Sequence, residues 1–338
     1  MTESRPGEPA LRIPRIAPVA AGVERPLWSV MIPTFNCARY LRQTLESVLA
    51  QDPGPSHMQI EVVDDASTED DPAAVVRDIG RGRVAFHRKT RNAGPTANFN
   101  TCVERSTGRL VHILHGDDLI SVGYYDTIGE LAERHPGLGL YATRCFFADE
   151  KLAVLATTDH IRELENPGRS PEPFFYATPI QCAGITVRRS SYEALGGFRP
   201  DLVHTADCEM WARVVTARGG VISGEIKATY RIFAANDSGR LAKTADNVRD
   251  TCRLNAIFAE RYPGFSAQSG RARVSDMAWH QYVKFKLAGE KQAAENNHRL
   301  WVELTPMRTR LWRILKSEIL PWFRRIRASF RGIVSDEA

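Results

Sequence analysis

Two adjacent carboxylates follow an apolar run in the first half of the chain. Residues 110–114 are typical of a buried strand, and His115, Gly116, Asp117 and Asp118 come directly after it. Open α/β sheets bind ligands beyond the carboxyl ends of their strands. Hard divalent cations prefer oxygen ligands and often contact a substrate phosphate as well. The stretch therefore predicts a metal site, with a solvated turn as the alternative because Gly-Asp pairs are common turn formers.

The composition is that of an ordinary globular protein. The chain has 338 residues, of which 43% are hydrophobic and 25% charged, enough for one large or two ordinary domains. No apolar run approaches the ~20 residues that span a bilayer, and the N-terminus lacks the apolar core of a signal peptide. The six cysteines are scattered without a CxxC pair. A disulfide framework or zinc site is therefore not expected, and the predicted location is the cytoplasm.

The formal charge of +5 is concentrated at the C-terminal end. Residues 306–338 carry eight Lys or Arg residues against three acids, so the remaining 305 residues sum to zero. A neutral body disfavours nucleic acid as a partner. The basic segment also contains aromatic residues, and this pattern favours peripheral contact with the inner face of the cell membrane. The alternative is a helix that packs on the rest of the protein with its arginines in solvent.

The apolar pattern predicts alternating strands and helices after a mobile tail at residues 1–26. Predicted strands lie at 27–33, 59–63, 84–87, 110–114 and 139–143. Helical spacing recurs between them, near 40–49, 73–79, 96–104 and 123–134. This alternation predicts an α/β fold with a mixed, mainly parallel sheet flanked by helices. Beyond residue 145 the pattern loosens, and residues 245–335 are mostly helical with breaks near Pro263 and Pro306.

Four separated motifs occur in an order and spacing that match one family. They are VMIPTFN at 30–36, VVDDAST at 62–68, NAG at 92–94 leading through Asn98 to HGDD at 115–118, and GGF at 196–198 followed by ADCEMW at 206–211. Together they cover about residues 27–235 and resemble the inverting nucleotide-sugar glycosyltransferases of family 2, which have the GT-A (Rossmann-like) fold.

The resemblance implies a domain organisation and a reaction. Residues 27–240 would form the catalytic domain, with a nucleotide-sugar half at about 27–120 and an acceptor half at about 121–240. Residues 241–338 would form a helical C-terminal region. The enzyme would move a sugar from a nucleotide-diphosphate sugar to a hydroxyl of a glycan or lipid-linked acceptor. Transfer would be a single displacement with inversion, assisted by Mg²⁺ or Mn²⁺.

The resemblance also implies roles for individual residues. Asp207 would be the catalytic base, and Asp117 and Asp118 would hold the metal. The nucleotide sugar would be bound by Pro33, Thr34, Asn36, Asp64, Asp65, Asn92, Asn98, His115, Gly116, Asp117 and Arg231. The acceptor side would include Gly197, Glu209 and Trp211.

Several of these residues have a structural alternative. Asp64 and Asp65 would also suit the N-terminal end of a helix, Asp207 would suit a helix N-cap, and Trp211 would suit core packing. Glu209 is either a support or an acceptor contact. For Arg231 the resemblance implies a clamp on the diphosphate.

The sequence departs from the family pattern at four places. His115 stands where the family usually has an acid, and Ala206 stands where it often has Glu. Cys208 replaces a usual Trp, and residues 233–235 replace a region that often contains a His. His115 therefore prompts the alternative of a non-catalytic relative that binds a glycan or nucleotide sugar. A sugar-phosphate nucleotidyltransferase is disfavoured, because the loop at residues 34–37 is not glycine-rich.

Overall fold

The computed structural model describes residues 13–233 and 236–314. By internal contacts the chain forms two compact units. The first comprises the residues up to Gly239 together with Glu260–Phe265. The second comprises Arg240–Ala259 and the residues from Ser266 onward.

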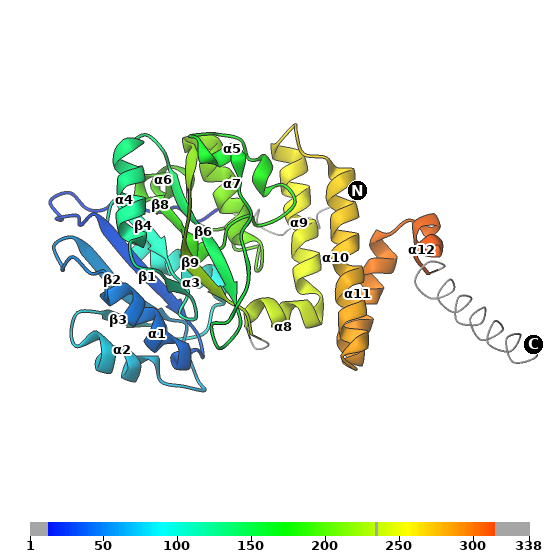
Figure 1. The fold of residues 1–338 in the computed structure, drawn as a ribbon, viewed down its shortest axis with the longest axis horizontal. Helices are drawn as coiled ribbons and strands as arrows, with labels where there is room; N and C mark the ends of the chain where they lie inside the picture. The colour runs from blue at the N-terminus through cyan, green and yellow to red at the C-terminus, as the bar shows by residue number, and fades with distance from the viewer. Residues whose placement is uncertain (1–12, 234–235, 315–338) are drawn as a thin grey trace, which may run out of the picture. The chain divides into compact units, whose positions relative to one another are not determined.

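The first half of the sheet is parallel. Its strands lie in the order β3-β2-β1-β4, with bounds β1 Trp28–Thr34, β2 Met58–Asp64, β3 Ala85–Arg88 and β4 Leu110–Ile113 (Figure 1). The connecting helices are α1 Ala38–Leu49, α2 Pro72–Gly80 and α3 Pro95–Arg105. All residues of β1 and β4 are buried, which is the pattern of parallel strands covered by helices on both faces. Proline at the first turn of α2 and α3 fits the helical backbone without losing an internal hydrogen bond.

The strand register brings the polar motifs to one edge of this sheet. Thr34 pairs with Asp64, and Asp64 pairs with Arg88, so β1, β2 and β3 end at the same level. The chain after β4 continues beside β1, because the Leu114 amide donates to the Met31 carbonyl. The motifs after β1, β2 and β4 are therefore neighbours, as expected for carboxyl ends of parallel strands.

The second half of the sheet is mixed. Its strands are β5 Leu119–Ile120, β6 Leu140–Ala148, β7 Val154–Thr157, β8 Ile185–Arg188 and β9 Gly220–Arg231. Strand β8 pairs antiparallel with both β4 and β6, β6 pairs parallel with β9, and β5 and β7 add antiparallel pairs. The predicted mixed α/β sheet is confirmed, with antiparallel pairs as frequent as parallel ones among the described strands. The helices and turns of this half are α4 Tyr124–Arg134, α5 Arg162–Glu165, η1 Glu172–Phe174, η2 Cys182–Gly184, α6 Arg189–Leu195 and α7 Ala206–Arg218.

The N-terminal segment differs from the predicted mobile tail. Residues 13–26 belong to the first unit, in which Ile16 is only 3% exposed. The Pro14 carbonyl accepts a hydrogen bond from the Gly197 amide, and the Ala17 carbonyl accepts from the Arg189 guanidinium. These partners are more than 170 residues away in sequence, so local composition gave no sign of them. Residues 1–12 lie outside the described residues.

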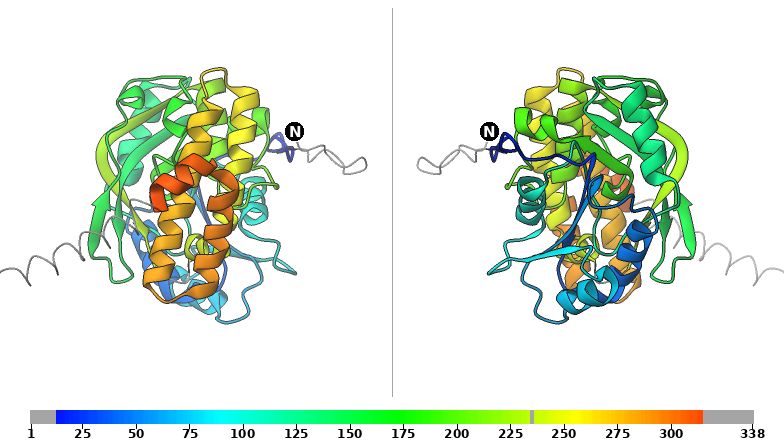
Figure 2. Two further views of the ribbon diagram at one scale, coloured as in Figure 1. Left: turned by 90° about the vertical axis from the view of Figure 1, so that its right-hand side faces the viewer. Right: turned by 90° about the vertical axis from the view of Figure 1, so that its left-hand side faces the viewer.

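The second unit is built from helices. They are α8 Asp237–Thr244, which begins in the first unit, α9 Asp246–Arg261, α10 Ala267–Leu287, α11 Lys291–Leu304 and α12 Met307–Ile314. Helices α10 and α11 lie side by side (Figure 2) around a core that includes Val274, Ala278, Leu300 and Trp301. Across residues 13–233 and 236–314, no helix has the length and apolarity to cross a membrane. Most of the basic segment, residues 315–338, lies outside the described part of the chain.

Candidate active site

The turn after β4 is held against the end of β1. The Gly116 amide donates to the Pro33 carbonyl at 3.1 Å. A Cβ atom at Gly116 would lie 3.0 Å from Cys37 Sγ and 3.1 Å from Thr34 Oγ1, which is tighter than ordinary packing allows. Glycine therefore lets the acidic turn approach the first strand closely.

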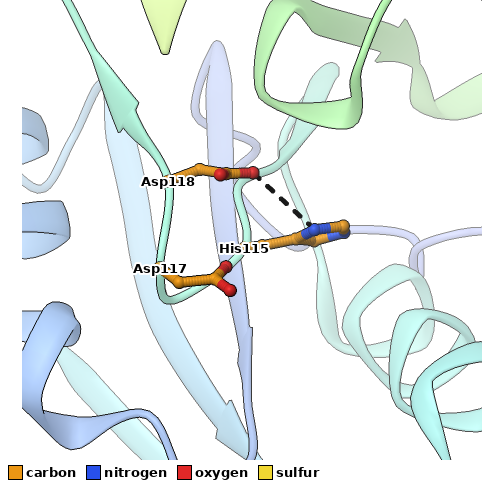
Figure 3. A group of neighbouring side chains, drawn as sticks. All are labelled: His115, Asp117 and Asp118. Atoms are coloured by element: carbon orange, nitrogen blue, oxygen red, sulfur yellow. Dashed lines mark ion pairs between the residues drawn. The ribbon is translucent and has the colours of Figure 1, made fainter. Parts of the chain in front are cut away.

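His115, Asp117 and Asp118 form one cluster at this turn. Their potential ligand atoms lie within 4.8 Å of one another, and Figure 3 shows the three side chains reaching from the turn toward a common space. His115 Nδ1 is 3.8 Å from Asp118 Oδ2. The imidazole ring is stacked on Phe99 of α3, with ring centroids 5.1 Å apart and an interplanar angle of 9°. The stack fixes the orientation of His115 toward the acids.

Burial shifts the titration of all three groups. It raises the pKa of Asp117 to about 6. Burial and then the charge of Asp117 raise the pKa of Asp118 well above its usual range. Burial lowers the pKa of His115 to about 4, so the imidazole is neutral at pH 7 and does not offset the acids.

The cluster fits a divalent cation. Asp118 Oδ2 and His115 Nε2 are buried and have no hydrogen-bond partner among the described residues. A bound cation would compensate a buried carboxylate that its neighbours leave unpaired. Two carboxylates are the donor set that Mg²⁺ and Mn²⁺ favour, and the neutral imidazole offers a nitrogen beside them.

Arg231 lies under the acidic turn, in the protein interior. Its side chain is among the largest fully buried ones, and the residue is 2% exposed. Its backbone amide donates to Asp118 Oδ1 at 2.9 Å, and its Nε donates to the Asp117 carbonyl at 2.9 Å. Its remaining bonds reach Gln43 and the Glu150 carbonyl. Arg231 therefore contacts the predicted metal ligands, and in this structure all of these bonds are to protein atoms.

The acids after β2 have partners as well. Asp64 is fully buried, and its Oδ1 accepts hydrogen bonds from the Ser67 amide and hydroxyl, while Arg88 donates to its Oδ2. Asp65 accepts from the backbone amides of residues 93 and 94 and pairs with Lys89. The alternative of helix N-terminal acids does not describe them, because α2 is capped by Asp71. Both acids instead organise the loops that surround the strand ends.

The other predicted nucleotide-sugar residues fall into two groups. Thr34 and Pro33 end β1 beside Gly116, and Asn36 accepts hydrogen bonds from the amides of Thr68 and Glu69. Asn92 is exposed on the loop before α3. Asn98 is different, because it is 3% exposed and its Nδ2 donates to the Val63 carbonyl. Asn98 therefore ties α3 to β2 rather than lining the edge.

Asp207 lies in the first turn of α7. The N-cap of this helix is Thr205, so the alternative in which Asp207 caps it is wrong. Burial raises the pKa of Tyr230, and the charges of Asp118, Asp117 and Asp207 raise it further. The charges of the predicted base and of both predicted metal ligands therefore act on the same residue of β9, Tyr230.

The three predicted acceptor-side residues are buried. Glu209 is 1% exposed and accepts from Arg213 Nε at 3.0 Å and Nη2 at 2.9 Å. Trp211 is 1% exposed and packs edge-on against Phe198. A Cβ at Gly197 would overlap Asn100 Oδ1. These residues support α7 and its neighbours from inside, which corrects the expectation that they face an acceptor.

Sequence reasoning missed three residues at the site. Phe99 stacks on His115, and the Thr44 hydroxyl of α1 lies 3.0 Å from the Gly116 carbonyl and 2.8 Å from the Asp118 carbonyl. Phe35 is 44% exposed directly after the buried strand β1. The sequence contained one sign of the role of Thr44, a polar residue on the otherwise apolar face of a helix. The sequence contained no such sign for Phe35, because its exposure directly after a buried strand is a property of the folded structure.

Comparisons with known proteins agree with this fold. Residues 29–196 match the family model of Glycosyl transferase family 2. The putative glycosyltransferase EpsE of Bacillus subtilis is 26% identical over 282 residues, which cover 79% of this chain and 96% of EpsE.

Two solved structures share the fold. Staphylococcus aureus TarS 1–349 in complex with UDP-GlcNAc superimposes with a TM-score of 0.56 at 14% identity, covering 83% of this chain and 82% of TarS. The Pyrobaculum calidifontis mannosyltransferase PcManGT in complex with GDP-Man and Mn²⁺ gives 0.54 at 18% identity, covering 88% and 85%.

The chain is therefore a glycosyltransferase with the GT-A fold. It belongs to glycosyltransferase family 2. The family match ends before α7 and β9, so the roles of Asp207 and Arg231 depend on the structure of this chain itself.

Proposed function

We propose that this enzyme transfers a sugar from a nucleotide-diphosphate sugar to a hydroxyl of a glycan or lipid-linked acceptor, with inversion at the anomeric carbon. The observation that carries the proposal is the cluster of His115, Asp117 and Asp118 at the carboxyl ends of the strands, with a buried carboxylate oxygen left unpaired. A relative of the same fold was solved with UDP-GlcNAc and another with GDP-Man and Mn²⁺. These complexes support a nucleotide-diphosphate sugar as donor.

The donor would lie along the edge formed by the ends of β1, β2 and β4. Pro33 and Thr34 end the first strand there, Asn36 follows it, and Asn92 lies on another loop, before α3. The exposed ring of Phe35 offers a flat apolar face to a nucleobase. Asp64 and Asp65 keep the surrounding loops in place through their bonds to Ser67, Arg88 and the 93–94 amides.

Asp117 and Asp118 would hold Mg²⁺ or Mn²⁺ at the diphosphate, with His115 beside them. When bound, the cation would supply Lewis-acid stabilisation of the negative charge on the departing nucleoside diphosphate. The residues of the chain prepare this place by keeping two acids and a neutral imidazole within 4.8 Å.

Asp207 would accept the proton of the acceptor hydroxyl as that oxygen attacks the anomeric carbon. Its place in the first turn of α7 is rigid, because the rest of that helix is largely buried. A single base suffices for one displacement, since the nucleoside diphosphate can leave without a proton. The attack comes from the face opposite the leaving group and therefore inverts the anomeric centre.

Names of relatives support an acceptor in the cell envelope. EpsE is named a putative glycosyltransferase, and others are named for succinoglycan and teichoic acid biosynthesis. We place this chain in polysaccharide biosynthesis, with the basic segment 306–338 as a peripheral membrane contact. Residues 315–338 of that segment lie outside the described structure, so this part rests on sequence.

A donor screen tests the proposal. Thermal denaturation is measured with a panel of UDP- and GDP-sugars, each with Mn²⁺ and with EDTA. A cognate donor raises the melting temperature by mass action, and the rise should require the metal. Incubation with that donor should release nucleoside diphosphate and produce a glycoside of inverted configuration. A panel in which no nucleotide sugar stabilises the enzyme would contradict the assignment of the edge as a donor site.

A further inference from the structure

We infer that Arg231 is a positioning residue that presets the metal-binding turn from inside the protein, rather than a clamp on the diphosphate. The inference rests on the proposed metal site at Asp117 and Asp118. It assigns to one residue at the end of β9 the task of fixing both acids before any ligand arrives.

The bonds of the Arg231 guanidinium reach three separate parts of the first unit. Nε donates to the Asp117 carbonyl at 2.9 Å, Nη1 to the Glu150 carbonyl at 3.2 Å, and Nη2 to Gln43 Oε1 at 2.7 Å. These acceptors belong to the acidic turn, the β6–β7 connection and α1. The guanidinium carbon also lies 4.5 Å from the centre of the Tyr40 ring. A planar fork with several fixed donors suits such a three-way junction.

The backbone of the same residue fixes the second acid. The Arg231 amide donates to Asp118 Oδ1 at 2.9 Å, while Asp118 Oδ2 has no hydrogen-bond partner among the described residues. One oxygen is therefore anchored and the other is left for a ligand. Asp117 and Asp118 are both held by one residue that is 113 or 114 positions away in sequence.

The positions of these contacts leave the guanidinium little access to a substrate. Arg231 is 2% exposed, and each described hydrogen bond of its guanidinium goes to an uncharged protein oxygen. Three of the five N–H donors of the guanidinium are used in these bonds, and a diphosphate could reach the other two only if the side chain left its buried position. Burial in this arrangement therefore keeps the guanidinium from clamping the substrate.

Charge and geometry predict opposite effects on metal binding. A positive charge near the cluster by itself repels a cation, so its removal alone would strengthen Mn²⁺ binding. Loss of positioning would weaken Mn²⁺ binding instead, since residues that orient metal ligands typically contribute 10- to 100-fold in affinity. Arg231→Met removes both the positive charge and the planar set of N–H donors, whereas Arg231→Lys keeps the charge and loses the planar set of donors.

The experiment measures Mn²⁺ binding alone by calorimetry on the full chain, with hydrogen exchange of peptides covering residues 115–118 and 149–153. We expect Arg231→Lys and Arg231→Met each to weaken Mn²⁺ binding about 10- to 100-fold and to speed exchange in both peptides. Gln43→Ala removes only one acceptor on an exposed residue and should weaken binding about fivefold, the equivalent of one hydrogen bond. The Gln43→Ala variant therefore still tests the contribution of this contact to Mn²⁺ affinity if Arg231→Met does not fold.

Arg189→Lys is the matched control. Arg189 is also 2% exposed and also donates to backbone carbonyls, at Ser106 and Ala17, but it lies away from the acidic turn. This variant should lose stability while Mn²⁺ binding stays within about twofold of wild type. Unchanged Mn²⁺ affinity in Arg231→Lys, or tighter binding in Arg231→Met, would overturn the positioning role alone. A wild-type enzyme that binds no Mn²⁺ would overturn the proposed metal site and this inference together.

Discussion

His115 Nδ1 lies 3.8 Å from Asp118 Oδ2, too far for a hydrogen bond, while its ring is stacked on Phe99. The imidazole is neutral at pH 7 because burial lowers its pKa to about 4. His115 therefore borders the acidic pair without cancelling its charge. The turn therefore keeps two acids at the end of β4 whose charge the imidazole does not offset, and its affinity for a cation can be measured.

Asp117→Asn should weaken the metal dependence of nucleotide binding. The amide keeps the size of the side chain but removes one negative charge from the cluster. We expect Mn²⁺-dependent binding of the nucleoside diphosphate to fall by at least about tenfold, since even indirect metal contacts contribute that much. Calorimetry with Mn²⁺ and with EDTA measures it. Equal affinity of the wild-type enzyme under both conditions would reject the metal assignment.

Asp207→Asn should abolish transfer while sparing donor binding. The amide is nearly isosteric, and the N-cap of α7 belongs to Thr205, so folding should be retained. It cannot take up the proton of the acceptor hydroxyl, and a general base typically contributes ~10²–10⁴-fold in rate. Turnover should fall by that factor with the donor dissociation constant little changed. Transfer within about threefold of wild type would show that the base is another residue, and a product of retained configuration would reject the single displacement.

Glu209→Ala should lower the folding stability of the enzyme rather than act on the catalytic step. Glu209 and Arg213 are each 1% exposed and paired at 2.9 Å, so removing the acid leaves a buried guanidinium without its carboxylate. Breaking a buried pair in this way costs about 3–5 kcal/mol of folding free energy. Urea denaturation of this variant beside Asp207→Asn separates the two roles. A stable Glu209→Ala enzyme without transfer activity would instead place Glu209 at the acceptor.

The stability of the enzyme should fall in acid partly through His112. This side chain is fully buried on β4, its Nε2 lies 3.0 Å from the Ala183 carbonyl, and burial lowers its pKa to about 3. Below pH 6.5 the His112 imidazole binds a proton in the unfolded chain but stays neutral in the folded chain, so the free energy of unfolding decreases as the pH falls. The loss is roughly 2 kcal/mol between pH 6.5 and 5.

Urea denaturation at several pH values measures this effect. His112→Gln should be less stable than wild type at pH 7.5, and the difference should shrink toward pH 5. The exposed His280 provides a control, and His280→Gln should leave the wild-type slope unchanged. A His112→Gln enzyme with the full wild-type slope would assign the acid sensitivity to other groups.

Removal of residues 306–338 should reduce association with anionic vesicles and leave donor binding intact. This segment carries the whole net positive charge of the chain. Each Lys or Arg near an anionic surface contributes ~1 kcal/mol, attenuated by salt. Co-sedimentation with vesicles rich in anionic lipid, at low and high salt, measures the effect. Unchanged co-sedimentation after truncation would reject membrane contact through this segment.

The sequence by itself determined the features that depend on local pattern. Alternating apolar runs predicted the first strands and helices, and the acids placed directly after two strands predicted the edge at which a ligand would bind. The order of the four motifs then indicated the family. These signals are readable because strand periodicity, glycine turns and strand-end acids involve residues within a few positions of one another.

Only the tertiary structure decided what each polar side chain contacts. Arg231 contacts Asp118 across 113 residues, and Pro14 contacts Gly197 across about 180 residues, so neither contact can be predicted from local spacing. The antiparallel insertion of β8 between β4 and β6 depends on how the chain crosses the sheet. Burial distinguishes Asp207, a partly exposed residue in the first turn of α7, from Glu209, which points inward to Arg213. Successive positions on a helix point about 100° apart, so two acids two residues apart face opposite ways, and packing selects which one is buried.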